Sequence, residues 1–221
     1  MAGDEKMSYE HERSKLVQRL KRHGYIESEQ VEMAMSKVPR HLFVPENVKS
    51  RAYVDSPQPI GQGQTISAPH MVAMMVENLD LKEGQKVLEI GGGRGYHAAV
   101  IAEVVGEKGR VITVELLESL ASDAKTVLKG AGYSNVKVVI GDGSKGFKQE
   151  SPYDRISVAC GAPEIPPPLL KQLKIGGKIL IPVGGSFYQN LILAVKTEEN
   201  KIKKKDLGGV LFVPLKGEYG Y

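Results

Sequence analysis

The stretch Val87-Leu88-Glu89-Ile90-Gly91-Gly92-Gly93-Arg94-Gly95 decides the fold, because it joins an apolar strand pattern to a glycine-rich turn. Residues 96–105 continue it with the apolar pattern of a buried helix. Glycine allows the backbone to pass close to a ligand, and the start of a helix presents amide groups and a positive dipole end. Ligands of open parallel sheets bind beyond the carboxyl ends of the strands. The stretch therefore predicts a crevice for a nucleotide-like cofactor.

Strand and helix patterns alternate after this stretch, which is typical of a parallel sheet with helices on both faces. We predict strands at 86–90, 110–114, 136–140 and 155–159, and helices at 96–105, 119–131 and 169–173. Further strands are predicted at 178–183, 190–196 and 210–213 without helices between them, so some must pair antiparallel. The expected fold is a doubly wound, mostly parallel, Rossmann-like α/β sheet with N-terminal helices and an antiparallel C-terminal strand region.

The N-terminal part contains helix patterns and one long irregular connection. Helices are expected at 14–23, at 28–38 with Ser28 as N-cap, and at 69–79 with Pro69 in the first turn. Prolines and glycines interrupt residues 40–69. Long ordered connections in compact domains tend to be functional, so we expect this one to take part in a site.

Length and composition limit the classes of protein that fit. The 221 residues suit a single domain, 1–221, comprising N-terminal helices and an active-site loop (1–79), a cofactor-binding core (80–200) and a C-terminal substrate-side segment (201–221). No apolar run is long enough to span a membrane, no secretory signal is visible, and the lone Cys160 favours the cytoplasm. The five histidines lack metal-ligand spacing. The net charge of +4 is small, and the lysines at 201–205 are interpreted as a solvated turn rather than a nucleic-acid surface.

Two acidic residues follow strands next to the glycine loop. The loop departs from the dinucleotide pattern because its third glycine, Gly95, comes one residue early, which fits a ligand without a pyrophosphate, such as S-adenosylmethionine. Glu115 ends the second strand, where a carboxylate can accept hydrogen bonds from both ribose hydroxyls. Asp142 follows the third strand and can accept from the adenine amino group. Glu89 can either fix the loop or approach the methionine end of the cofactor, and both roles stay open.

Several longer segments make a more specific resemblance. Gly141-Asp142-Gly143-Ser144-Lys145-Gly146-Phe147 and Ser151-Pro152-Tyr153-Asp154-Arg155-Ile156 resemble the signature of the protein-L-isoaspartate O-methyltransferases, which are class I S-adenosylmethionine-dependent methyltransferases. Gln64-Thr65-Ile66-Ser67-Ala68-Pro69-His70-Met71 resembles their active-site loop, and Val38-Pro39-Arg40 and 208–215 also match. The chain departs from the family pattern at Gly92, where Thr or Ser is usual, and at Arg94, where a small residue is usual. The resemblance covers nearly the whole chain.

The resemblance implies an activity and a set of site residues. The enzyme would transfer a methyl group from S-adenosyl-L-methionine to the carboxylate of L-isoaspartyl residues in damaged proteins, leaving S-adenosyl-L-homocysteine. It implies Ser67 as the catalytic residue. The expected substrate contacts are Ile60, Thr65, Ser67, Val213 and Leu215. The expected cofactor contacts are Gln64, Thr65, Ile66, Ser67, Glu89, Gly91, Gly93, Gly95, Glu115, Leu116, Asp142 and Gly143.

The implied reaction needs positioning rather than a general base. A carboxyl group of this kind has a pKa of about 3.5 and is ionised at pH 7. Ser67 precedes the helix that starts at Pro69, where amide groups favour an anion, although an N-cap serine would occupy the same place. His70 is expected to shape the loop, since no nucleophile-elbow pattern surrounds Ser67. The alternatives are a same-fold methyltransferase acting on RNA or a small molecule, and a non-catalytic module that keeps the cofactor pocket. Isoaspartyl proteins are the expected partners of a monomer that binds neither nucleic acid nor membrane.

Overall fold

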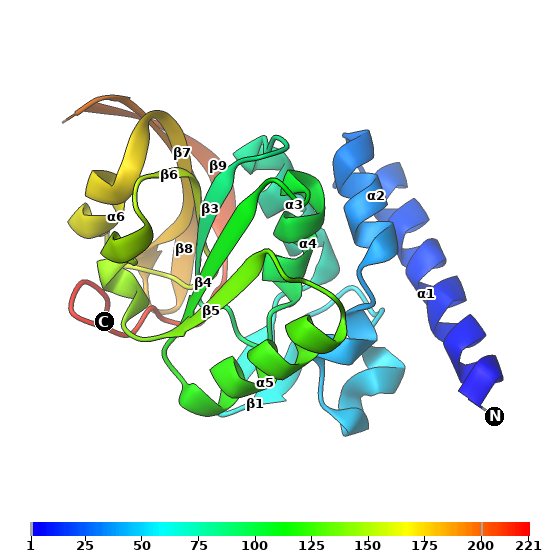
Figure 1. Ribbon diagram of the computed structural model, residues 1–221. Coiled ribbons are helices and arrows are strands. Elements are labelled where there is room, and N and C mark those ends of the chain that lie inside the picture. Colours follow the sequence, from blue (N-terminus) through cyan, green and yellow to red (C-terminus); the bar gives the residue numbers. More distant parts are fainter. Residues whose placement is uncertain (1, 200) are drawn as a thin grey trace.

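The computed structural model of the chain describes residues 2–199 and 201–221. Its centre is a sheet of seven strands in the order β5-β4-β3-β6-β7-β8-β9 (Figure 1). The strands are β3 (Lys86–Ile90), β4 (Arg110–Glu115), β5 (Val136–Ile140), β6 (Tyr153–Val158), β7 (Leu173–Gly185), β8 (Tyr188–Glu198) and β9 (Lys201–Val210). Neighbours from β5 to β7 pair parallel, whereas β8 pairs antiparallel with β7 and with β9. The predicted mostly parallel α/β fold with an antiparallel end is thus confirmed.

Helices cover both faces of this sheet (Figure 1). The helices are α1 (Ala2–Arg22), α2 (Glu29–Lys37), α3 (Pro69–Leu79), α4 (Tyr96–Val105), α5 (Glu118–Gly130) and α6 (Pro167–Gln172). The larger apolar core joins residues of α1 to α5 to one sheet face, and the smaller core joins α6 to the other face. The inner parallel strands β3, β4 and β6 are buried on both sides, which explains their mostly apolar sequences.

Local signals explain where the N-terminal helices begin and end. The Ser28 hydroxyl accepts a hydrogen bond from the Val31 amide at 3.3 Å and so caps α2 as predicted. Helix α3 starts with Pro69 in its first turn, also as predicted, and ends at Asp80, which has a φ of +50°. No described helix is both long and apolar enough to cross a membrane.

The connection from 40 to 69 contains short regular pieces that the sequence did not indicate. Two 3-10 turns, Arg40–Phe43 and Glu46–Arg51, lead to a small antiparallel sheet of β1 (Gln58–Gly61) and β2 (Gln64–Ile66). Two more 3-10 turns, Gly143–Lys145 and Lys148–Glu150, lie between β5 and β6. The small sheet places Thr65 and Ser67 just ahead of α3.

Two predictions at the C-terminal end were wrong. The lysine-rich residues 201–205 belong to strand β9, not to a turn. The strand predicted at 210–213 instead leaves the sheet after Val210, and residues 211–213 run toward the carboxyl ends of the parallel strands. An edge strand needs only one paired side, and lysines on its open side keep other strands from adding to it. Such a strand does not need the apolar pattern of a buried strand, so the polar composition of residues 201–205 did not indicate it.

Candidate active site

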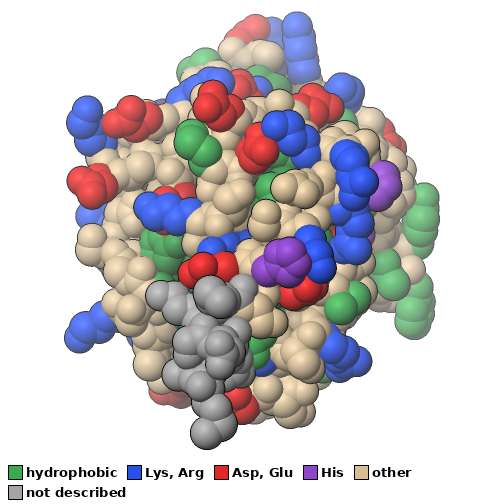
Figure 2. Space-filling view, turned by 90° about the vertical axis from the view of Figure 1, so that its right-hand side faces the viewer, with side chains coloured by type: hydrophobic (Ala, Val, Ile, Leu, Met, Phe, Trp, Pro, Cys, Tyr) green, Lys and Arg blue, Asp and Glu red, His purple; other side chains and the backbone are tan. Residues whose placement is uncertain are grey.

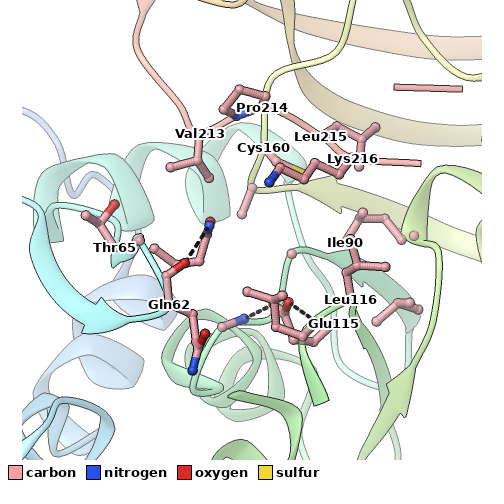
Figure 3. A pocket seen from close by; sticks show the side chains of 18 of the residues that line it. Gln62, Thr65, Ile90, Glu115, Leu116, Cys160, Val213, Pro214, Leu215 and Lys216 are labelled. Carbon is pink, nitrogen blue, oxygen red and sulfur yellow. Dashed lines mark hydrogen bonds between the residues drawn. The ribbon is translucent and has the colours of Figure 1, made fainter. Parts of the chain in front are cut away.

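A cavity of about 430 Å³ lies at the carboxyl ends of β3, β4 and β6, as expected for an open α/β sheet (Figure 3). The small β1–β2 sheet forms one side of it, and the C-terminal segment Val213–Lys216 forms the opposite side. Its lining residues are Ile60, Gln62, Gly63, Gln64, Thr65, Ile90, Gly91, Gly93, Val114, Glu115, Leu116, Leu117, Gly143, Ala159, Cys160, Val213, Pro214, Leu215 and Lys216.

The glycine loop between β3 and α4 is shaped by positive φ angles that favour glycine. Gly91, Gly93 and Gly95 have φ angles of +82°, +53° and +94°. A Cβ atom on Gly93 would lie 3.1 Å from Ile60 across the cavity, and one on Gly95 would lie 2.9 Å from Leu128 of α5. The loop therefore brings backbone to the cavity wall and lets α4 pack closely.

The two departures from the family pattern have local explanations. A Cβ atom on Gly92 would lie 2.2 Å from the Thr113 hydroxyl of β4, so a larger residue would require that side chain to move. Arg94 forms an ion pair with Asp123 of α5, so its guanidinium is turned toward that helix rather than the large cavity.

Glu115 is held at the cavity wall by backbone donors. Its Oε2 accepts from the Gly93 amide at 2.8 Å and its Oε1 accepts from the Leu117 amide at 2.9 Å (Figure 3). An ionised carboxylate oxygen has a second lone pair, so each oxygen can accept one more hydrogen bond from a ligand. This arrangement suits the two neighbouring hydroxyls of a ribose.

Glu89 lies beneath the glycine loop and does not line the large cavity. Its side chain is fully buried, and its Oε1 lies 3.5 Å from Nδ1 of His97 on α4. Burial raises the pKa of Glu89 to about 7, with an opposing effect of the Thr113 hydroxyl and a smaller raising effect of Glu115. Burial also lowers the pKa of His97 to about 4. Near pH 7 the His97 ring is therefore neutral, so its contact with Glu89 is not an ion pair between two charged groups.

Asp142 does not line the cavity, whereas its neighbour Gly143 does. The Asp142 Oδ1 accepts from the Ser144 amide and hydroxyl at 2.9 and 2.6 Å, and its Oδ2 accepts from the Glu218 amide at 3.0 Å. These contacts with Ser144 and Glu218 lower its pKa against the raising effect of burial. The carboxylate thus holds the C-terminal segment against the turn after β5.

Ser67 lies in a second cavity of about 270 Å³, next to the first. Thr65, Ala159 and Val213 line both cavities, so the two spaces meet there. Ala68, not Ser67, is the N-cap of α3, and no described group forms a hydrogen bond with the Ser67 hydroxyl. The capping alternative for Ser67 is therefore wrong.

His70 has a structural partner in the same loop. Its Nδ1 and its backbone amide both lie 2.9 Å from Oδ1 of Asp55. The contact ties the first turn of α3 to the connection before β1, which agrees with the expected shaping role. Within the described part of the chain, no group of three His, Cys, Asp or Glu side chains is arranged to hold a metal ion.

Four of the remaining predicted residues line the large cavity, and two line neither of the two cavities. Gln64, Leu116 and Leu215 line the large cavity, and Ile60 lies on its wall rather than in the Ser67 cavity. Ile66 is buried and lines only a cleft of about 40 Å³ beneath the loops, whereas Gly95 lines none of these spaces. Their roles stay predictions.

Sequence reasoning missed several residues of the cavity walls. Ala159 and Cys160 follow β6, and the rule that places ligands at the carboxyl ends of parallel strands would have indicated them. Burial raises the pKa of the Cys160 thiol, with further raising effects of Glu115 and Glu89, so it stays protonated and is a wall residue rather than a nucleophile. Lys216 reaches the cavity from a segment without regular structure, which no pattern could place (Figure 3).

The residues present fit S-adenosylmethionine, and fold and site together define a class I S-adenosylmethionine-dependent methyltransferase. A glycine loop without room for side chains follows β3, and an anchored carboxylate follows β4. A cavity of about 430 Å³ lies between them and the C-terminal segment.

The chain belongs to the protein-L-isoaspartate(D-aspartate) O-methyltransferase family, whose model matches residues 11–220. It is 58% identical over 222 residues to the protein-L-isoaspartate O-methyltransferase of Methanopyrus kandleri, covering 100% of this chain and 98% of the relative. It is 56% identical over 215 residues to protein-L-isoaspartate O-methyltransferase 2 of Archaeoglobus fulgidus, covering 97% of each chain.

Solved structures described as members of this family have the same fold as this chain. One protein-L-isoaspartate O-methyltransferase superposes with a TM-score of 0.86 at 35% identity, covering 94% of this chain and 67% of the other. A Plasmodium falciparum structure described as a protein of this family, in complex with S-adenosyl-L-homocysteine, superposes with a TM-score of 0.81 at 28% identity. The matched parts are 92% of this chain and 98% of that one.

Proposed function

We propose that this protein transfers a methyl group from S-adenosyl-L-methionine to the free carboxyl group of L-isoaspartyl residues in damaged proteins and peptides. The products would be S-adenosyl-L-homocysteine and a methyl ester that initiates repair. The observation that carries the proposal is the meeting of two cavities at Thr65, Ala159 and Val213. One cavity has the features of a cofactor site, and the other contains the Ser67 hydroxyl, which forms no hydrogen bond with any described residue.

The chain's own residues would act by binding and orientation. When bound, S-adenosylmethionine supplies a methyl group that is already activated on a sulfonium. Glu115 would accept hydrogen bonds from the ribose hydroxyls, and the amide groups of the glycine loop would define the floor. Ser67 would donate a hydrogen bond to the substrate carboxylate, and Thr65 could add a second donor at the junction. Orientation of reacting groups can contribute about 7–11 kcal/mol to lowering a barrier.

The carboxylate substrate needs no proton removed, so the reaction would not require a general base where the two cavities meet. His70 is engaged by Asp55, and the Cys160 thiol stays protonated. Our proposal also includes a monomeric enzyme of the cytoplasm that acts without nucleic acid. The single buried thiol, in a chain without a disulfide partner for it, supports a reducing compartment.

One assay tests the proposed function directly. The protein is incubated with cofactor labelled in its methyl group and three acceptors: an isoaspartyl peptide, the same peptide with a normal aspartyl residue, and bulk RNA. Base-labile label on the isoaspartyl peptide alone is the expected result. Labelling of RNA alone would favour the same-fold RNA methyltransferase, and cofactor binding without any transfer would favour a binding module.

Ser67→Ala tests the role of the hydroxyl. We expect kcat to fall by about 10- to 100-fold, as for the loss of one hydrogen bond to a charged group, with S-adenosyl-L-homocysteine affinity within a few-fold. Ser122→Ala, on the exposed face of α5, is the matched control and should leave kcat unchanged. Equal turnover of both variants would show that the Ser67 hydroxyl has no part in the reaction.

A further inference from the structure

Arg40 is a fully buried cation beside the candidate active-site loop. It begins the 3-10 turn after Pro39, and its side chain has no exposed surface. Among the described residues it has no carboxylate within ion-pair distance. Burial lowers its pKa, opposed by Tyr96, Tyr53 and Asp55. Because burying a charge without a paired carboxylate is costly, the contacts that Arg40 does make need an explanation.

Those contacts join three separate segments. The Nε of Arg40 donates to the Ala52 carbonyl at 2.8 Å, and one terminal nitrogen donates to the Ser67 carbonyl at 2.8 Å. Its guanidinium carbon lies 4.7 Å from the centre of the Tyr96 ring, a cation–π distance. Tyr96 is the first residue of α4, directly after the glycine loop.

We propose that Arg40 is a positioning residue that fixes Ser67 relative to the glycine loop, and so sets the distance from Ser67 to the large cavity. This inference rests on the proposed function. The planar fork of a guanidinium can bond two carbonyls while its face lies on a ring, which a lysine ammonium cannot do. The Ser67 residue is therefore held through its carbonyl, and its hydroxyl stays free to meet a ligand.

The chain offers a matched control in Arg155. This residue is also largely buried, and its guanidinium donates to three backbone carbonyls, those of Leu79, Asp80 and Asp154. It lies near the start of β6, at the amino ends of the parallel strands, whereas the cavity lies at their carboxyl ends. Arg40→Lys and Arg155→Lys therefore remove comparable hydrogen bonds, one beside the site and one away from it.

Both variants should lower the urea midpoint of unfolding, but only Arg40→Lys should impair methyl transfer. We expect its kcat on an isoaspartyl peptide to fall at least tenfold relative to Arg155→Lys, with S-adenosyl-L-homocysteine affinity within about threefold. Hydrogen exchange of the amides at 65–68 should be at least tenfold faster in Arg40→Lys alone. Equal kcat, or equal exchange at 65–68, in the two folded variants overturns the proposal.

A second variant covers the case in which Arg40→Lys does not fold. Tyr96→Leu keeps the guanidinium but removes the ring beneath it, and should give a smaller loss of kcat, about threefold, with faster exchange at 65–68. A folded Tyr96→Leu protein with wild-type kcat and exchange overturns the proposal. If the wild-type protein does not methylate the isoaspartyl peptide, the proposed function fails, whereas the exchange comparison still tests the role of Arg40.

Discussion

At the scale of single residues, burial shifts the pKa values of two side chains near the glycine loop, Glu89 and His97, in opposite directions. The pKa of Glu89 is raised from 4.5 to about 7, so the folded state binds more protons than the unfolded state in this range. Its contribution to stability is fully present below pH 4.5 and is lost as the pH rises through about 7. The pKa of His97 is lowered from 6.5 to about 4, so its contribution rises with pH over nearly the same range. The two slopes largely cancel in the wild-type protein.

Replacing either group with a neutral side chain should leave only the pH dependence of stability that the other group causes. Glu89→Gln should gain stability relative to wild type by about 3 kcal/mol between pH 4.5 and 7, at 1.36 kcal/mol for each pKa unit. His97→Asn should lose stability relative to wild type between pH 4 and 6.5. Urea unfolding at pH 5, 6, 7 and 8 measures both, with the exposed Glu83→Gln as control. Parallel profiles for all four proteins would refute the argument.

The same residues show what a sequence can reveal about a site. Glu115 was predicted from its place at a strand end, because a parallel sheet brings such ends to one edge. The location of Glu89 under the loop could not be predicted, since both its proposed roles suit the same position in sequence. Arg40 was noticed as part of the Val38-Pro39-Arg40 match, but its role could not be predicted, because its partners are backbone carbonyls at Ala52 and Ser67, which carry no side-chain signature.

At the scale of elements, the C-terminal segment acts as a wall rather than as a strand. Val213–Lys216 line the large cavity, and the following residues are attached to the turn after β5. The Glu218 amide donates to Asp142 at 3.0 Å and the Tyr219 amide donates to the Ser144 hydroxyl at 3.1 Å. The sequence predicted a final strand at 210–213, because a short apolar run cannot distinguish a sheet strand from an extended segment that leaves the sheet.

Removing residues 217–221 should therefore weaken cofactor binding. We expect the Kd for S-adenosyl-L-homocysteine to rise about tenfold, equivalent to 1.4 kcal/mol, because the wall loses its attachment to Asp142. Calorimetric titration measures it. Glu218→Gln is the control: it removes only the ion pair with Lys145, whose side chains are both more than half exposed, and should change Kd by less than twofold. An unchanged Kd after truncation would mean that residues 213–216 keep their position without the attachment to Asp142.

At the scale of the whole molecule, surface charge is mixed on the face that carries α1 (Figure 2) and mostly positive on the edge strand β9. Acidic and basic side chains alternate over the face that carries α1 (Figure 2). The formal net charge is +4, and the exposed edge strand β9 carries Lys201, Lys203, Lys204 and Lys205. Gly209 and Val210 at the end of this strand, and residues 211–213 after it, line the Ser67 cavity. The lysines lie four to eight residues before Gly209, about 13–26 Å along the strand. That distance is within the Debye length of about 30 Å at 0.01 M salt but beyond that of about 8 Å at 0.15 M, so their field would reach the peptide entrance only at low salt.

This arrangement should give a salt dependence that depends on the substrate. The kcat/KM of an isoaspartyl peptide with acidic flanking residues should fall several-fold between about 0.01 and 0.15 M salt, over which screening becomes strong. A peptide with neutral flanks should change little, because its only recognised charge is the carboxylate held inside the cavity. Replacing the four lysines of β9 with glutamine removes as many positive charges as the chain's formal excess of +4, and should abolish most of the salt effect on the acidic peptide. If the acidic peptide keeps its full salt dependence in that variant, the steering charge lies elsewhere on the surface.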